Sequence, residues 1–303
     1  MAAASSMMRR VAFVACLVAA TSCDQAKNPP AAKNSAAAFS FSPGPTTSSA
    51  KLWDDDIGAV LATPSIDGGA PLFFSRDSTS RADIDVDLLN HDDHPLHGRL
   101  HPADAEHACA ARRHARVTMA DGTPAPSSWS LALAPGLATP IGIDGVGDLL
   151  PRDSAALVAR IARLVSAIPE DSLTAQFRGL PVVVRDAWRF RLADSTSVVV
   201  AIAMRSLNVE SNPRAQSITI VAEPDPTSGS DAWRNVFSES ESGPEDRVEG
   251  ADLLAVFQLR GARAALALVH EAASGLQLEI VERTAPGVWK IRWSSASLSC
   301  AQP

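Results

Sequence analysis

Six of the seven histidines fall within one stretch of 24 residues, interleaved with four acidic residues. Neutral imidazole is the commonest protein ligand for zinc, copper and nickel, and carboxylates can complete the coordination sphere. The histidines are His91, His94, His97, His101, His107 and His114, and all but the last are candidate ligands of a Zn, Cu or Ni ion. Because Pro95 and Pro102 interrupt the stretch, no single helix face can gather all of these side chains. Weak surface binding and a plain polar loop are the alternatives.

Two further patterns resemble metal sites in part. Asp83, Asp85 and Asp87 alternate with apolar residues, so a strand would place the three carboxylates on one face. This run departs from the EF-hand loop, which needs a glycine and a final glutamate at fixed positions, and we expect a solvated strand face. His270-Glu271 begins like the zinc-peptidase H-E-x-x-H, but Ser274 stands at the second histidine position. Without a partner one turn further on, one helix face cannot supply two ligands, so we expect no peptidase site there.

The recognised catalytic motifs are absent from the sequence. It contains no G-x-S-x-G nucleophile elbow and no G-x-x-x-x-G-K-[ST] phosphate loop. The glycines of residues 142–147 have the wrong spacing for a dinucleotide fold. We therefore expect a protein without catalytic activity, with a hydrolase of unrecognised type as an alternative.

Residues 1–22 have the features of an export signal. Arg9 and Arg10 form a short positive start, and residues 11–20 (VAFVACLVAA) are uncharged and apolar. At ~1.5 Å per residue these helical residues would rise about 15 Å, half of the ~30 Å hydrocarbon core, so the segment is too short to span it. Ala20-Thr21-Ser22-Cys23 resembles the lipobox of bacterial lipoprotein precursors, although Ala20 stands where Leu or Val is usual. The resemblance is limited to about the first 25 residues.

That resemblance implies an acyl lipid, such as palmitate, on Cys23 and a location outside the cytoplasm, on the periplasmic side or the cell surface of a bacterium. Cleavage after Ala20 without lipidation, giving a secreted or periplasmic soluble protein, is the alternative. Loss of Cys16 with the signal and lipidation of Cys23 leave Cys109 and Cys300. In an oxidising compartment a lone pair of cysteines usually joins, so we expect a disulfide, with two buried thiols as the alternative.

Composition divides the remaining chain. Residues 23–50, the lipidated N-terminus and its stalk, are rich in Ala, Ser and Pro without hydrophobic periodicity, so they cannot offset their ordering entropy by burial. Residues 51–150 predict a smaller β-rich region, either a domain of its own or extra strands on the main one, and residues 151–303 predict a helix plus an antiparallel β domain. Loss of Arg9 and Arg10 moves the net charge from −7 to −9, which disfavours nucleic-acid binding.

Hydrophobic periodicity predicts a mainly β protein with minor α structure, folded as an antiparallel sandwich or barrel-like meander. One apolar stripe indicates a single amphipathic helix at about residues 153–168, capped by Asp153 or Ser154. Residues 225–250 are rich in Ser, Pro and acid, and predict a mobile loop interrupted by a short strand at Trp233–Phe237. The predicted strands of the C-terminal half are 188–192, 198–204, 218–220, 253–259, 264–270, 276–280 and 289–293.

These patterns favour a non-catalytic, lipid-anchored cell-envelope protein with a binding or structural role. It would meet the membrane through its lipid and bind another envelope protein or a cell-wall component. The first alternative is a metal-binding lipoprotein that uses the segment from His91 to His114. The second is an extracytoplasmic hydrolase.

Overall fold

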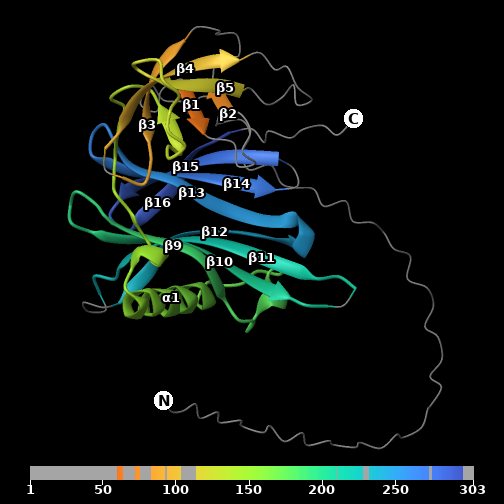
Figure 1. The fold of residues 1–303 in the computed structure, drawn as a ribbon. Helices are drawn as coiled ribbons and strands as arrows, with labels where there is room; N and C mark the ends of the chain where they lie inside the picture. Colours follow the sequence, from red (N-terminus) through yellow and green to blue (C-terminus); the bar gives the residue numbers. More distant parts are fainter. Residues whose placement is uncertain are drawn as a thin grey trace, which may run out of the picture. The chain divides into compact units, whose positions relative to one another are not determined.

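The fold is given by a computed structural model, which describes residues 60–63, 72–75, 83–92, 94–103, 114–209, 211–227, 232–272 and 275–295. All four cysteines and His107 lie outside these residues, so the expected lipidation and disulfide remain predictions. The described residues form three antiparallel sheets and one α-helix, which confirms a mainly β fold with minor α structure (Figure 1). Within them, no helix is both long enough and apolar enough to cross a membrane.

The first sheet contains the six N-terminal strands. These are β1 (Val60–Thr63), β2 (Leu72–Ser75), β3 (Ile84–Leu89), β4 (Leu96–Ala103), β5 (His114–Met119) and β6 (Leu131–Leu133), in the order β1-β2-β5-β4-β3-β6. Strand β6 also pairs with β1, through Ala132 and Ala62. Apolar residues alternate along β3 and β4 and bury one face of each strand, as at Val86, Leu88 and Leu100. On the other face of β3, Asp87 and Leu89 are buried as well.

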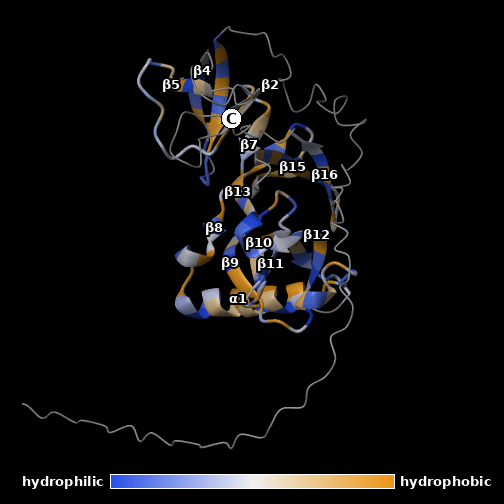
Figure 2. Cartoon of the chain, turned by 90° about the vertical axis from the view of Figure 1, so that its right-hand side faces the viewer, coloured by the Kyte–Doolittle hydropathy of each residue, from blue (hydrophilic) through white to orange (hydrophobic). Residues whose placement is uncertain are grey.

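The second sheet carries the helix. Its strands are β8 (Asp144–Gly145), β9 (Val183–Arg191), β10 (Ser197–Leu207), β11 (Arg214–Pro224) and β12 (Trp233–Pro244), in the order β12-β11-β10-β9-β8. Helix α1 (Pro151–Ser166) buries Leu157, Ile161 and Val165 against one face of this sheet. Figure 2 shows apolar and polar residues alternating around α1.

The predicted helix is present, but its ends differ. It begins with Pro151 after Leu150, not at a cap on Asp153 or Ser154, and it ends at Ser166. Proline fits the first helical position because its fixed φ suits the helix and its missing N–H would have no partner there. The described residues also contain three short 3₁₀ helices, η2 (Val146–Asp148), η3 (Ala175–Phe177) and η4 (Glu245–Arg247).

The third sheet packs on the second and is buried on both faces. Its strands are β7 (Ala138–Pro140), β13 (Val248–Leu259), β14 (Arg263–Ala272), β15 (Gly275–Ala285) and β16 (Val288–Ser294), in the order β16-β15-β14-β13-β7. On β14, Leu266 and Leu268 join the apolar core shared with β9, β10 and β11, whereas Ala265 and Ala267 face a different core. Polar side chains on β14 and β15 are therefore held between layers, not in solvent.

The short strand predicted at Trp233–Phe237 is present, but the loop predicted on either side of it is wrong at residues 238–244 and 248–250, which are strand. β12 runs from Trp233 to Pro244 and pairs with β11 along that whole range, with one register shift between Val221 and Ala222. The serine- and glutamate-rich composition is typical of a loop, but Ser and Glu alternate with a period of two. That alternation fits an edge strand with one face toward the neighbouring sheet.

Candidate metal centre

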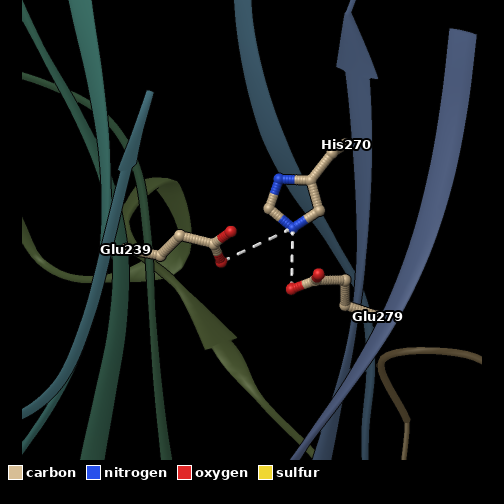
Figure 3. A group of neighbouring side chains, drawn as sticks. All are labelled: Glu239, His270 and Glu279. Atoms are coloured by element: carbon tan, nitrogen blue, oxygen red, sulfur yellow. Dashed lines mark ion pairs between the residues drawn. The ribbon is translucent and has the colours of Figure 1, made fainter. Parts of the chain in front are cut away.

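Three strands bring one histidine and two glutamates together between the second and third sheets. Glu239 lies on β12, His270 on β14 and Glu279 on β15. Glu279 is paired with Leu268, and His270 follows Leu268 by two residues, so both face the apolar core between the two sheets. Figure 3 shows the two carboxylates directed at the same imidazole nitrogen.

The spacing of these atoms suits a small cation. His270 Nε2 lies 3.4 Å from Glu279 Oε2 and 3.9 Å from Glu239 Oε2. One ligand atom from each of the three residues lies within 4.8 Å of the others. Tetrahedral zinc with bonds of ~2.0–2.2 Å separates its ligand atoms by roughly 3.3–3.6 Å. The nearer pair already has this spacing, and the 3.9 Å pair would have to close by about 0.3 Å or more to complete the coordination.

The same three atoms lack hydrogen-bond partners. Glu239 Oε2, His270 Nε2 and Glu279 Oε2 are all buried, and none makes a hydrogen bond. The side chains of Glu279, His270 and Glu239 are 7%, 19% and 35% exposed, so the cluster opens to solvent on the side of Glu239. Buried polar atoms almost always have a partner. Here the three atoms face one another as ion pairs without hydrogen bonds, an arrangement that a bound cation could complete.

The charges of the cluster are strongly linked. Burial, followed by repulsion from Glu279, raises the pKa of Glu239 to about 7, although attraction to His270 opposes this shift. Burial alone would lower the pKa of His270, but its contacts with Glu279 and Glu239 outweigh burial and raise it. Burial would likewise raise the pKa of Glu279, but His270 and a hydrogen bond from Ser294 lower it. The three pKa shifts therefore arise from burial and from the contacts that these side chains make with one another.

A second buried charge cluster lies four residues further along β15. Arg283 donates from Nε and Nη2 to the two oxygens of Glu223, at 2.8 and 3.1 Å, and from Nη1 to Asp194 at 2.7 Å. Glu223 also accepts from Trp289 Nε1 and from the backbone N–H of Gly287. The hydrogen bond from Arg283 is the main reason why the pKa of Asp194 falls to about 2. Every oxygen of Glu223 is satisfied, so this cluster is complete within the chain.

The histidines that the sequence singled out are separated from one another. His97 Nδ1 pairs with Asp87 at 2.7 Å, and His101 Nδ1 pairs with Asp83 at 2.8 Å. With Arg99 and Asp85 between them, these pairs form a cross-strand ladder from β4 to β3 and to Asp83 just before it, so the three aspartates do share one face. The expected solvated face is wrong at Asp87, which is buried and also accepts a hydrogen bond from the backbone N–H of Gly136.

The other members of the histidine segment lie apart from this ladder. His91 Nε2 lies 3.3 Å from the carbonyl oxygen of Leu253, and His94 is exposed. His114 lies on β5, and His107 falls outside the described residues. In the part of the chain that the structure describes, groups of three possible ligands converge only at Glu239, His270 and Glu279.

Sequence reasoning missed this cluster for two reasons. The test applied to His270 required a second ligand one helical turn later, but its partners come from two other strands. Glu279 alternates with Leu278 and Ile280, which reads as a solvated strand face. The sequence did contain one indication of the site. The strands of the third sheet have apolar residues on both faces, which is typical of a sheet buried on both sides, and a charged residue on such a sheet is unusual. The chain was also compared with known proteins: no family model, no curated protein and no solved structure matches it.

Proposed function

We propose that this chain is a lipid-anchored protein outside the cytoplasm that binds one divalent transition-metal ion, with zinc as the first candidate. Glu239, His270 and Glu279 hold the ion between the two packed sheets. The observation that supports the proposal most directly is the convergence of three buried, unsatisfied ligand atoms on one point. The proposal replaces the segment from His91 to His114 as the favoured metal site and assigns no reaction.

The donor set favours a first-row ion of intermediate softness. Imidazole suits zinc, copper, iron and nickel, and carboxylates are also accepted by zinc. Three protein ligands leave one position of a tetrahedral ion open, and water can occupy it. Because Glu239 is the most exposed ligand, the open position lies on its side of the cluster. This arrangement suits capture of an ion from solution.

The metal proposal is tested by native mass spectrometry of the purified full-length protein, without a histidine tag, after incubation with zinc and removal of the excess. We expect one zinc per chain, and its loss in His270→Ala and in Glu279→Gln. His97→Ala is the matched control, because it removes another histidine–carboxylate pair on a different sheet. The proposal would be wrong if His270→Ala still bound a full equivalent of zinc and a triple variant with His91→Ala, His94→Ala and His97→Ala lost it. That result would place the zinc site in the histidine segment.

The location is supported by the signal features of residues 1–22 and by the lipobox-like residues before Cys23. Residues 24–50 would then act as a stalk that holds the sheets away from the lipid. Cys23→Ser should move the protein from the membrane fraction to the soluble fraction and abolish incorporation of labelled palmitate. Membrane retention of this variant would contradict lipid anchoring without affecting the metal proposal.

A further inference from the structure

We infer that Ser294 determines which ion the centre accepts. Its hydroxyl holds one oxygen of Glu279 away from the ion, so the centre selects a zinc-like ion over calcium. This inference rests on the proposed function, because it concerns the same ligands. It adds a specificity-determining residue that does not touch the metal.

The geometry gives the two oxygens of Glu279 different roles. Ser294 lies on β16 directly opposite Glu279, and its Oγ donates to Glu279 Oε1 at 2.8 Å. The other oxygen, Oε2, is the unsatisfied atom that faces His270. Because Glu279 is 5% exposed, its carboxylate has little room to rotate. The hydrogen bond therefore fixes Glu279 as a ligand that offers one oxygen.

Zinc and calcium differ in the number and kind of ligands they need, so a glutamate that offers one oxygen favours zinc. Calcium takes six to eight oxygen ligands at about 2.3–2.6 Å and commonly uses both oxygens of a carboxylate. Zinc takes four ligands and accepts imidazole with single carboxylate oxygens. A centre with one nitrogen and two single oxygens supplies three of the four donors that zinc needs, but only two of the six to eight oxygens that calcium takes. Residues that orient a ligand in this way typically change metal affinity 10- to 100-fold when they are replaced, roughly as for other outer-shell partners.

Ser295 provides a matched control. It is the next residue in the chain and also uses its hydroxyl as a hydrogen-bonding group, but the partner is the backbone N–H of Leu278 at 2.9 Å. Replacing Ser295 therefore perturbs the same strand end without releasing a metal ligand. Threonine and valine at position 294 form a second control, because they have nearly the same shape and only threonine has a hydroxyl.

The experiment measures the zinc and calcium dissociation constants of the full-length protein by isothermal titration, with a competing chelator for zinc. In Ser294→Ala we expect zinc binding to weaken by about 10- to 100-fold and the zinc-to-calcium affinity ratio to fall. Ser294→Thr should stay within about threefold of the original zinc affinity, Ser294→Val should behave as Ser294→Ala does, and Ser295→Ala should bind zinc unchanged. Should Ser294→Ala fail to fold, the Thr and Val pair isolates the hydroxyl.

The outcomes separate this inference from the proposed function. Absence of zinc binding by the unmodified protein overturns both. Zinc binding by the unmodified protein with an unchanged affinity and ion ratio in Ser294→Ala and Ser294→Val overturns the role of Ser294 alone. Equal losses in Ser294→Thr and Ser294→Val also overturn it, because they would show that packing, not the hydroxyl, matters at this position.

Discussion

The Glu223–Arg283 cluster and the Glu239–His270–Glu279 cluster share the layer between the same two sheets, yet they compensate buried charge differently. Glu223 accepts four hydrogen bonds, three of them from side chains, and faces a guanidinium that is always charged. The other cluster buries two carboxylates around one imidazole and leaves an unsatisfied atom on each residue. One cluster carries its cation as a side chain, and the other is where we propose that a cation from solution binds.

The two clusters differ in the free-energy cost of burying their carboxylates. Burying an ion is favourable only if its partners replace the lost hydration, and leaving a carboxylate without its cation costs several kcal/mol. A buried cluster that lacks compensation in the free chain therefore gains most when a cation binds. The comparison predicts that removing a charge from the Glu223–Arg283 cluster lowers the free energy of unfolding. Removing a negative charge from the Glu239–His270–Glu279 cluster, or adding metal to it, should raise the free energy of unfolding.

The largest effect is expected from Arg283→Met, which keeps the apolar stem and removes the guanidinium. Glu223 would then be a buried carboxylate without a cation, and the free energy of unfolding should fall by about 3–5 kcal/mol. Urea unfolding followed by tryptophan fluorescence measures this loss. A second change, Glu223→Gln, in the same chain should recover part of it. A loss below about 1 kcal/mol would mean that the Arg283 guanidinium does not balance the buried charge of Glu223.

Zinc should stabilise the protein to a comparable extent. At a free zinc concentration of 100 times the dissociation constant, binding to the folded state alone adds about 2.7 kcal/mol. Thermal unfolding with and without zinc measures this gain, which should be absent in His270→Ala and retained in Arg283→Met. An equal gain in His270→Ala would place the responsible zinc elsewhere.

Without metal, Glu239→Gln should stabilise the protein at pH 8. Because the pKa of Glu239 is raised to about 7, the folded state loses stability as pH rises from about 4.5 to 7, when this carboxylate becomes charged beside Glu279. The glutamine cannot ionise, and with a discount for the exposed third of the side chain we expect a gain of about 1 kcal/mol. Chemical denaturation at pH 8 and pH 5 tests this, and a gain that is no larger at pH 8 contradicts it.

The smallest effect should come from Asp194. Because its pKa is lowered to about 2, Asp194 contributes stability above pH 3.8 that is lost as pH falls toward 2. Its side chain is 48% exposed, so we expect a contribution of about 1 kcal/mol or less. Asp194→Asn should therefore flatten the acid limb of a stability-against-pH curve while leaving the curve above pH 5 parallel to the original.

The sequence predicted the fold better than the site, for a physical reason. Period-two alternation is a local property, and it placed most strands of the C-terminal half, such as β14 and β15, correctly. It also misled at Ile291, which is 46% exposed although it alternates with Trp289 and Trp293. Irregular register between β15 and β16 turns the two tryptophans to opposite faces there, and a bulge leaves no clear signature in the sequence.

The metal centre could not be predicted because its residues meet only through sheet packing. His270 and Glu279 become neighbours through the register of β14 with β15, and Glu239 joins them when the second sheet packs on the third. No spacing along the chain encodes a contact between sheets. The described histidines of the segment have the opposite character, since they are close in sequence but lie in a loop and on strands that separate them.

The ladder between β3 and β4 has a consequence for how these strands find their alignment. Two short strands with alternating apolar residues can slide past each other, and a slip of one residue moves every side chain to the other face. In the correct alignment Asp87, Asp85 and Asp83 meet His97, Arg99 and His101. A slipped alignment would set the aspartates against Leu96, Gly98 and Leu100. The side-chain pairs along this hairpin therefore favour the correct register of β3 with β4, and they give the alternation of Asp with His and Arg a structural role that needs no ligand.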